Sequence, residues 1–338
     1  MKRRGILCGG CWLVDHNNTI SHWPEQETLT QIVAREIQGG GPAHNMALDL
    51  ARLAPGFPVS AAGVVGNDDA GRLLIAACAR HGIEHCGLHV LDGVGTSHTD
   101  VMTVRSTGKR TFFHHQGANA LLGPEHFDFS TTAARILHLG APGIHARMDA
   151  AGNEEANGWV TVLRRARAAG LRTNLEMISG EPEEVRRLVT PCLQHLDSLI
   201  INDYEAGVLT GIDIVSGGMT SAGAARRAAV ALLVKGPLEL VAIHFPGGCV
   251  AATRDGEVIA RPSLDVPPEA IKGANGAGDA FAAGVLYGLH EGWPVDECLS
   301  LGLCAAASAL RSVSTTESVG TVAECRALAD MWGWRAPI

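Results

Sequence analysis

The stretch GANGAGDAF, from Gly273 to Phe281, decides the fold of this chain. It combines three glycines with one carboxylate, Asp279, and it leads into an apolar repeat at Phe281, Val285 and Leu289 with the spacing of one helix face. The glycines therefore predict a turn into a helix, whose first backbone amides point outward and carry partial positive charge. Since glycine has no side chain, an anion can bind directly to those amides.

Asp279 falls in the first turn of this helix, beside the expected anion. A carboxylate next to a phosphate is electrostatically unfavourable, so its placement there suggests a chemical role. The role that fits is to accept a proton from a hydroxyl that attacks phosphorus. An ordinary glycine turn followed by an acidic first-turn residue explains this stretch equally well when it is considered alone. The chain has no G-x-x-x-x-G-K-[ST] motif and no G-x-G-x-x-G spacing here, which excludes a P-loop and a dinucleotide-binding fingerprint.

The composition is that of an ordinary globular protein. The chain has 338 residues, of which 46% are hydrophobic, and a formal net charge of −8. This charge and the absence of a basic run argue against a nucleic-acid partner. No apolar stretch is long enough for a membrane span, and the N-terminal segment lacks the apolar run of a signal peptide. We therefore expect a cytoplasmic protein with no membrane partner.

Nine cysteines are scattered along the chain, and one pair, Cys8 and Cys11, has C-x-x-C spacing. A zinc site would need a second pair or histidines at ligand spacing, and a redox motif would open a helix after a strand. Neither pattern is present. We therefore expect two buried cysteines around a glycine bend within a single opening strand, residues 5–15.

Strand and helix patterns alternate after this opening. A helical pattern covers 42–54, a strand pattern 59–66 and a second helix 70–82, and the alternation continues to an apolar helix over 301–310. This order predicts an α/β fold with a doubly wound, mostly parallel sheet and helices on both faces. Polar and alternating segments form two insertions, 16–38 and 97–116, of which the second is a hairpin signal. We expect one domain, residues 1–338, with these insertions as a small β lid.

Six motifs, in order along nearly the whole chain, resemble those of the ribokinase-like (PfkB) carbohydrate kinases. GGCWLVD resembles the opening G-x-x-x-x-D, GGGPAHNMALDLARL the G-G-x-x-x-N-x-A element, and GVVGNDDAGRLL the G-x-D-x-x-G element. GKRTFFHHQGANALL resembles the segment that closes the lid hairpin, and INDYEAGVLTG the N-x-x-E motif. GANGAGDAFAAG resembles the C-terminal signature D-T-x-G-A-G-D-x-F.

The resemblance implies an ATP-dependent kinase that transfers the γ-phosphoryl group to a hydroxyl of a small sugar. In this family Asp279 would be the catalytic base, and the amides of Gly276, Ala277 and Gly278 would form the anion hole. The lid would exclude water from the reaction. Because lid strands of relatives can pair between subunits, the resemblance also implies a homodimer through the lid.

The resemblance also implies the binding residues. The positions that hold the sugar hydroxyls are matched by Asp15, Gly40, Gly41 and Asn45. Asn202 and Glu205 match the pair that organises Mg²⁺ and the ATP phosphates through water, and Asn202 also has the context of a helix N-cap. Further candidates for the ATP site, on its adenine side, are His244, Pro246, Gly248 and Cys304. We interpret Asp68 as a turn residue and not as a ligand.

The sequence departs from the family pattern at two places. The leading D-T of the signature is Gly273-Ala274 here, and the missing carboxylate argues against a monovalent cation site near the anion hole. The nucleotide loop, usually close to T-L-G-x-x-G, reads HFPGGC from His244 to Cys249. The choice of nucleotide is therefore less well defined by the sequence than the transfer of a phosphoryl group.

Two other functions stay open. A nucleoside kinase would need an aromatic slot for a base, and Trp12 and Trp23 lie near the expected sugar site. A catalytically silent sugar-binding regulator would share the fold. His114 and His115 invite a metal-site interpretation, but neighbouring residues of a strand point to opposite faces, which argues against joint ligation.

Overall fold

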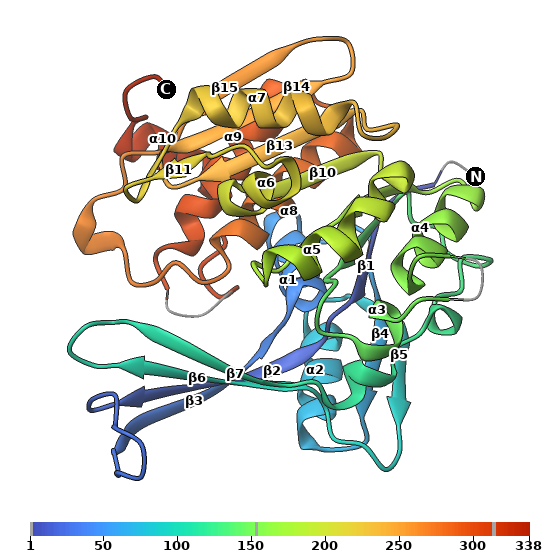
Figure 1. Ribbon diagram of the computed structural model, residues 1–338, viewed down its shortest axis with the longest axis vertical. Coiled ribbons are helices and arrows are strands. Elements are labelled where there is room, and N and C mark those ends of the chain that lie inside the picture. The colour runs from blue at the N-terminus through green and yellow to red at the C-terminus, as the bar shows by residue number, and fades with distance from the viewer. Residues whose placement is uncertain (1–2, 153–154, 313–315) are drawn as a thin grey trace.

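A large sheet with helices on both faces carries a smaller sheet at one end (Figure 1). The computed structural model describes residues 3–152, 155–312 and 316–338. The large sheet has, in spatial order, β15 (Val258–Pro262), β14 (Gly248–Thr253), β13 (Leu240–Phe245), β10 (Ser198–Asn202), β9 (Arg172–Leu175), β8 (Ile136–Gly140), β1 (Ile6–Gly10), β4 (Val59–Gly66) and β5 (Glu84–Leu91). Pairing is parallel from β13 to β5, and β14 and β15 extend the sheet antiparallel. The predicted doubly wound α/β fold is confirmed.

Two hydrophobic cores sandwich the large sheet, one on each face. Successive residues of a strand point to opposite faces of the sheet, so Ile6 and Cys8 pack in one core and Leu7 packs in the other. The first core is covered by α1 (Pro42–Leu53), α2 (Asp69–Arg80), α8 (Ala277–Glu291), α9 (Val295–Ala309) and α10 (Val322–Trp332). The second is covered by α3 (Ala146–Asp149), α4 (Gly158–Ala168), α5 (Pro182–Val189), α6 (Asp203–Thr210) and α7 (Ala222–Leu233). None of the helices described could cross a membrane, because none is long and apolar enough.

Helix α8 packs directly against α9 through two glycines. A Cβ atom built on Gly284 would lie 2.8 Å from the Cα atom of Gly302, and one on Gly302 would lie 2.9 Å from the backbone oxygen of Phe281. Such distances are far shorter than van der Waals contact, so only glycine permits this close crossing. The crossing buries Phe281 and Val285 and fixes the position of the helix that begins with GANGAGDAF.

The smaller sheet, called the small sheet below, is built from the two predicted insertions. Its order is β3 (Ile32–Gly40), β2 (Leu13–Ile20), β6 (His98–Val104) and β7 (Arg110–His115). The central strands β2 and β6 are parallel, and the outer strands are antiparallel to them. The strands extend slightly beyond the predicted segment 16–38, because β2 begins at Leu13. A separate two-stranded ribbon is formed by β11 (Val215–Ser216) and β12 (Met219–Thr220).

The prediction of one opening strand over residues 5–15 is wrong, because the chain leaves the large sheet at Gly10. Gly10 has a φ of +113°, and a Cβ there would lie 1.7 Å from the carbonyl oxygen of Gly140. Cys8 therefore lies in β1, while Cys11 lies in the connection to β2. Both thiols are free and fully buried, and burial raises the pKa of each. The interpretation of this pair as core cysteines is confirmed.

The elements near the C-terminus were only partly predicted. The segment HFPGGC forms the turn between β13 and β14, and the sequence did not indicate β14, β15 or α10. The last two strands are short and the hairpin turn is built from Pro246 and Gly247. Because α10 follows the apolar helix that we expected to be last, it adds a further layer over α9.

Candidate active site

The start of α8 lies at the edge of the large sheet where the parallel strands end. Gly276 caps the helix with a φ of +74°, a left-handed conformation that favours glycine. No carbonyl or side chain among the described residues accepts a hydrogen bond from the amides of Gly276, Ala277 and Gly278. A Cβ on Gly278 would lie 3.1 Å from the ring of His244, which comes from β13. Three open amides at a positive helix end are a suitable site for an anion.

Asp279 lies beside these amides and faces polar groups. Asn45 Nδ2 on α1 donates a 2.7 Å hydrogen bond to Asp279 Oδ2. A second carboxyl group, that of Glu176, lies close enough to Asp279 for each to affect the pKa of the other. Burial, followed by the charge of Glu176, raises the pKa of Asp279 well above its usual range. Burial likewise raises the pKa of Glu176 to about 7. Two carboxyl groups this close together cannot both ionise easily, so they compete for a proton.

Sequence reasoning did not identify Glu176 or the side chains behind it. Ser198 Oγ donates to Asn174 Oδ1 at 3.1 Å, which turns the amide nitrogen of Asn174 toward His138 Nδ1 at 3.0 Å. His138 Nδ1 is then the acceptor, and the proton of the neutral ring lies on Nε2. That atom is 2.7 Å from Glu176 Oε2, although without the alignment of a hydrogen bond. Burial lowers the pKa of His138 to about 4, which keeps the ring neutral.

A sequence signal for this group exists. His138, Asn174 and Ser198 are polar residues within the buried strands β8, β9 and β10, and Glu176 directly follows β9. Buried polar residues are unusual and normally have partners. Nevertheless, only the strand order of the sheet joins these four residues into a chain of contacts that ends at Glu176 beside Asp279, and the sequence alone did not define that order.

The expected sugar-binding residues converge near Asp279. A Cβ on Gly40 would lie 2.2 Å from Asp15 Oδ2, and one on Gly41, where φ is +92°, would lie 2.7 Å from the carbonyl oxygen of Cys11. Both glycines are therefore required for close approach. Burial, followed by the charge of Asp279, raises the pKa of Asp15 to about 7. Asp15 and Asn45 thus offer acceptor and donor groups near the carboxyl group of Asp279.

A cavity of about 520 Å³ separates the small sheet from the loop before α8. On the small sheet its lining includes Asn17, Thr19, Glu36, Thr103 and Arg110, and on the loop it includes Lys272, Gly273 and Asn275. The lining is polar, as a site for a hydroxylated molecule requires. One face of the small sheet, called the inner face, therefore bounds the space beside the loop that leads into α8.

A second cavity of about 520 Å³ lies on the other side of the α8 N-terminus. Its lining includes Asn202, His244, Pro246, Gly248 and Gly278, four of which were predicted to lie on the ATP side. Apolar residues of α9 and its C-cap complete the wall, namely Leu303, Ala306, Ala307 and the C-cap Leu310. An apolar wall joined to open amides can accept the ring and the phosphates of a nucleotide.

Cys304 does not line this cavity, which contradicts its predicted contact with adenine. The lining residues of α9 recur every three or four positions and form one helix face. Cys304 lies beside that face and is fully buried, with Cys325 of α10 near it. It therefore packs in the core between these helices.

Asn202 and Glu205 form the N-terminal cap of α6. Asn202 Oδ1 accepts from the Glu205 amide at 2.8 Å, and Glu205 Oε2 accepts from the Asn202 amide at 3.1 Å, a capping box. Ser179 Oγ donates to Glu205 Oε1 at 3.1 Å. The expected N-cap role of Asn202 is thus confirmed. These bonds leave further lone pairs on the side-chain oxygens, and the expected contact with a metal ion through water stays a prediction.

Several carboxyl groups lie around the α6 cap, an arrangement that suits the binding of a divalent cation. Burial raises the pKa values of Glu176, Glu205 and Asp279, and the charge of a neighbouring carboxyl group raises each of them further. Glu176 Oε2 is also buried without an aligned donor. A hard cation with oxygen ligands, such as Mg²⁺, would offset this negative charge.

Two further expectations concern Asp68 and Trp12. Asp68 is the N-cap of α2, where its carboxylate accepts from the amides of Gly71 at 2.8 Å and Thr96 at 2.7 Å, so its predicted turn role is confirmed.

Trp12 is fully buried, and its indole nitrogen donates to the carbonyl oxygen of Ala62 at 3.1 Å. Trp12 is therefore a core residue and cannot stack on a nucleoside base.

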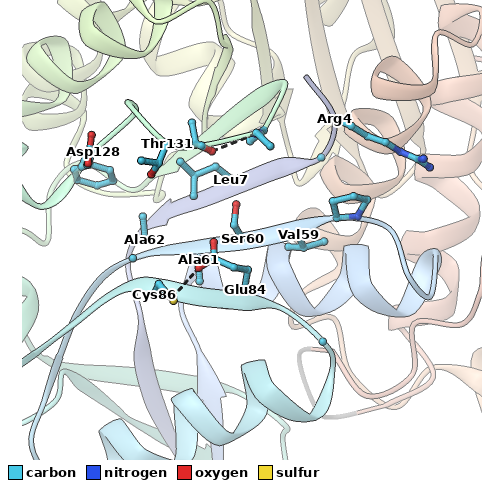
Figure 2. A pocket seen from close by; sticks show the side chains of 18 of the residues that line it. Arg4, Leu7, Val59, Ser60, Ala61, Ala62, Glu84, Cys86, Asp128 and Thr131 are labelled. Atoms are coloured by element: carbon cyan, nitrogen blue, oxygen red, sulfur yellow. Dashed lines mark hydrogen bonds between the residues drawn. The ribbon is translucent and has the colours of Figure 1, made fainter. Parts of the chain in front are cut away.

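Another cavity, of about 780 Å³, lies elsewhere. It is lined by residues at the beginnings of β1, β4 and β5, including Leu7, Val59, Ser60 and Glu84 (Figure 2). Parallel strands of such sheets bind ligands at their carboxyl ends. The cavity is thus at the opposite edge of the sheet from Asp279 and has no part in the site.

The chain resembles known carbohydrate kinases along its length. The model of the pfkB family of carbohydrate kinases matches residues 11–321. A 5-dehydro-2-deoxygluconokinase of Shouchella clausii is 24% identical over 340 residues, which cover 97% of this chain and 96% of the relative.

Solved structures agree with this assignment at the level of the fold. A ribokinase of Giardia lamblia superposes with a TM-score of 0.80 at 18% identity and covers 98% of this chain and 100% of its own. A ribokinase of Arabidopsis thaliana, solved with ribose and ATP, gives a TM-score of 0.78 at 19% identity and covers 97% of this chain and 99% of its own. The match to the family model over nearly the whole sequence, together with this fold, shows that the chain is a carbohydrate kinase of the pfkB family.

Proposed function

We propose that the protein transfers the γ-phosphoryl group of ATP to a hydroxyl group of a small sugar, with Asp279 as the catalytic base. The observation that carries this proposal is the position of Asp279 beside the open α8 amides, with a polar cavity along the preceding loop and a partly apolar cavity at Ala277 and Gly278. A sugar in the first cavity and a nucleotide in the second would place the hydroxyl and the phosphoryl group on either side of Asp279. Burial and the charge of Glu176 raise the pKa of Asp279 by more than Asn45 and His138 lower it, so the carboxyl group suits proton transfer.

The residues around Asp279 have separate roles in sugar binding, proton transfer and charge stabilisation. Asp15 and Asn45 hold sugar hydroxyls, while Gly40 and Gly41 allow the sugar to approach the backbone. Asp279 takes the proton of the attacking hydroxyl, and the amides of Gly276, Ala277 and Gly278 stabilise the charge on the transferred group. Donors at a helix N-terminus need no reorganisation during the reaction, which is why they are effective.

Mg²⁺ is the metal that this arrangement suits. Asn202 and Glu205 would hold it through water while their side chains keep the α6 cap. When bound, the ion would neutralise phosphate charge. His244, Pro246 and Gly248 would line the nucleotide side.

We further propose that the small sheet is the lid of a single-domain enzyme and a dimer contact. In support, large apolar side chains are exposed on the small sheet and its loops, including Trp23, Leu29, Ile37, Phe112 and Phe113. Exposed apolar groups at this density are typical of an interaction surface. Sedimentation velocity tests this proposal, because a dimer that dissociates on Phe113→Glu supports it and a monomeric wild type excludes it.

A screen of acceptors with ATP and Mg²⁺ tests the proposed reaction. Aldoses, ketoses and deoxy keto-sugar acids should include a substrate, because the named relative is a 5-dehydro-2-deoxygluconokinase. Turnover on nucleosides alone would favour the nucleoside kinase, although the burial of Trp12 removes one of its two candidate aromatic contacts. Tight sugar binding without turnover on any acceptor would indicate a silent sugar-binding regulator.

A further inference from the structure

Three metal-ligating side chains meet on the face of the small sheet that points away from α8. Asn17 and Thr19 of β2 line the cavity toward Gly273, so alternation along the strand puts His16 on the opposite face. In the parallel pairing of β2 with β6, His16 lies opposite Asp100, and His98 precedes Asp100 by two residues. These three residues, called the His16 cluster below, therefore share the outer face.

The donor atoms of the His16 cluster are already close together. One ligand atom from each residue lies within 4.8 Å of the other two. The Nδ1 atom of His16 is 3.2 Å from Asp100 Oδ1. Four ligands at zinc distances of about 2.0–2.2 Å in a tetrahedron lie roughly 3.3–3.6 Å apart. The His16–Asp100 separation already has about this value, and His98 needs only a small side-chain movement.

Neighbouring side chains orient the cluster. Asn18, which is buried, donates from Nδ2 to Asp100 Oδ1 at 3.5 Å, and its own Oδ1 accepts from Arg35 Nε at 2.7 Å. The ring of His98 stacks between the rings of His16 and His115, with centroid distances of 5.2 and 4.9 Å. Side chains that hold ligands in place are a regular part of metal sites and raise affinity.

We propose that His16, His98 and Asp100 bind one divalent transition-metal ion, with Zn²⁺ as the best fit. Two imidazoles and one carboxylate suit Zn²⁺, Ni²⁺ or Cu²⁺, whereas Mg²⁺ prefers oxygen ligands alone. The side chains of His16 and Asp100 are 27% and 32% exposed, so water can complete the coordination. The ion would join β2 to β6. It would be separate from the cation of phosphoryl transfer, since Asn202 and Glu205 lie at the start of α6 and not on the small sheet.

Calorimetric titration of Zn²⁺ into chelator-treated protein, without ATP, tests this proposal. The Cys86→Ser background removes the one exposed thiol. We expect one ion per chain, and Co²⁺ as a probe should give visible d–d bands without a thiolate charge-transfer band. Asp100→Asn, which preserves size, and His98→Ala should each weaken binding at least about tenfold. His22→Ala, an exposed histidine of the loop between β2 and β3, is the matched control and should leave binding unchanged.

The result that overturns the proposal is equally concrete. If no saturable binding of one ion per chain occurs, or if Asp100→Asn and His98→Ala both bind Zn²⁺ as tightly as the control, the cluster is only an ion pair with stacked rings. Far-UV circular dichroism of each variant shows whether the fold is retained. Asp100→Asn retains nearly all contacts of the wild type, so loss of binding by that folded variant supports the assignment.

Discussion

Glu176 is the residue that most changes the chemistry of Asp279. The two carboxyl groups lie close together, and the charge of Glu176 contributes to the raised pKa of Asp279. His138 lies 2.7 Å from the other side of Glu176 and stays neutral, so it does not cancel that charge. Glu176 is therefore a positioning residue that sets when the proposed base can accept a proton.

The variant Glu176→Gln removes this charge at nearly constant size. The pKa of Asp279 should fall, because one cause of its elevation is gone. We expect the acid limb of the pH profile of kcat/KM to move to lower pH, which steady-state kinetics over pH 5–9 would measure. The exposed Glu183→Gln on α5 is the control. An unmoved acid limb in Glu176→Gln would mean that the two groups are not coupled during catalysis.

The substitution Gly40→Ala, which adds one methyl group, tests the close approach of Asp15 to Gly40. The Cβ atom of Gly40→Ala would lie 2.2 Å from Asp15 Oδ2, so the carboxylate must move. We expect the KM for the sugar to rise at least about tenfold, by the loss of about 1.4 kcal/mol or more of binding, with the KM for ATP unchanged. Gly95→Ala is the control, since its nearest atom would be 3.6 Å away. Equal sugar KM values for both variants would exclude Asp15 from the sugar site.

At the scale of elements, the position of α8 depends on its glycine contact with α9. Gly284→Ala would place a methyl group 2.8 Å from the backbone of Gly302. Overpacking costs about 1–3 kcal/mol, which outweighs a gain of up to about 1 kcal/mol in helix propensity. Chemical denaturation should therefore show a lower free energy of unfolding.

Gly223→Ala in α7 is the matched control for this crossing. Its added methyl group would have no neighbour closer than 3.9 Å, so the variant should be as stable as the wild type or more stable. If Gly284→Ala were as stable as Gly223→Ala, the α8–α9 crossing could open without cost, and the account of how α8 is held would be wrong.

The elements that the sequence predicted are those with local signals. The glycine turn, the apolar repeat at Phe281 and Val285, and the cap Asn202 each depend on neighbouring residues, and the structure has them where expected. Glu176 and His138 could not be placed, because their proximity to Asp279 depends on the order of β8, β9 and β10 in the sheet. The opening strand was predicted too long because the break at Gly10 depends on the approach of Gly140, 130 residues later.

For the whole molecule, the raised pKa of Asp15 predicts a pH-dependent stability. Its value of about 7 lies well above the ordinary value of 3.8, so the folded state binds a proton that the unfolded chain has lost. The stabilising contribution is complete below about pH 4 and is lost as the pH rises through 7. Denaturation of the ligand-free protein at pH 5 and pH 8 should show that the wild type loses more stability than Asp15→Asn. A difference of the opposite sign would contradict the burial of an ionisable Asp15.

The most direct test of the central claim is the turnover of Asp279→Asn on the best sugar of the acceptor screen. Since a positioned base contributes about 10²- to 10⁴-fold, kcat should fall by at least about a hundredfold, while calorimetry shows ATP binding within about threefold of the wild type. Wild-type turnover by this variant would contradict the assignment of Asp279 as the base.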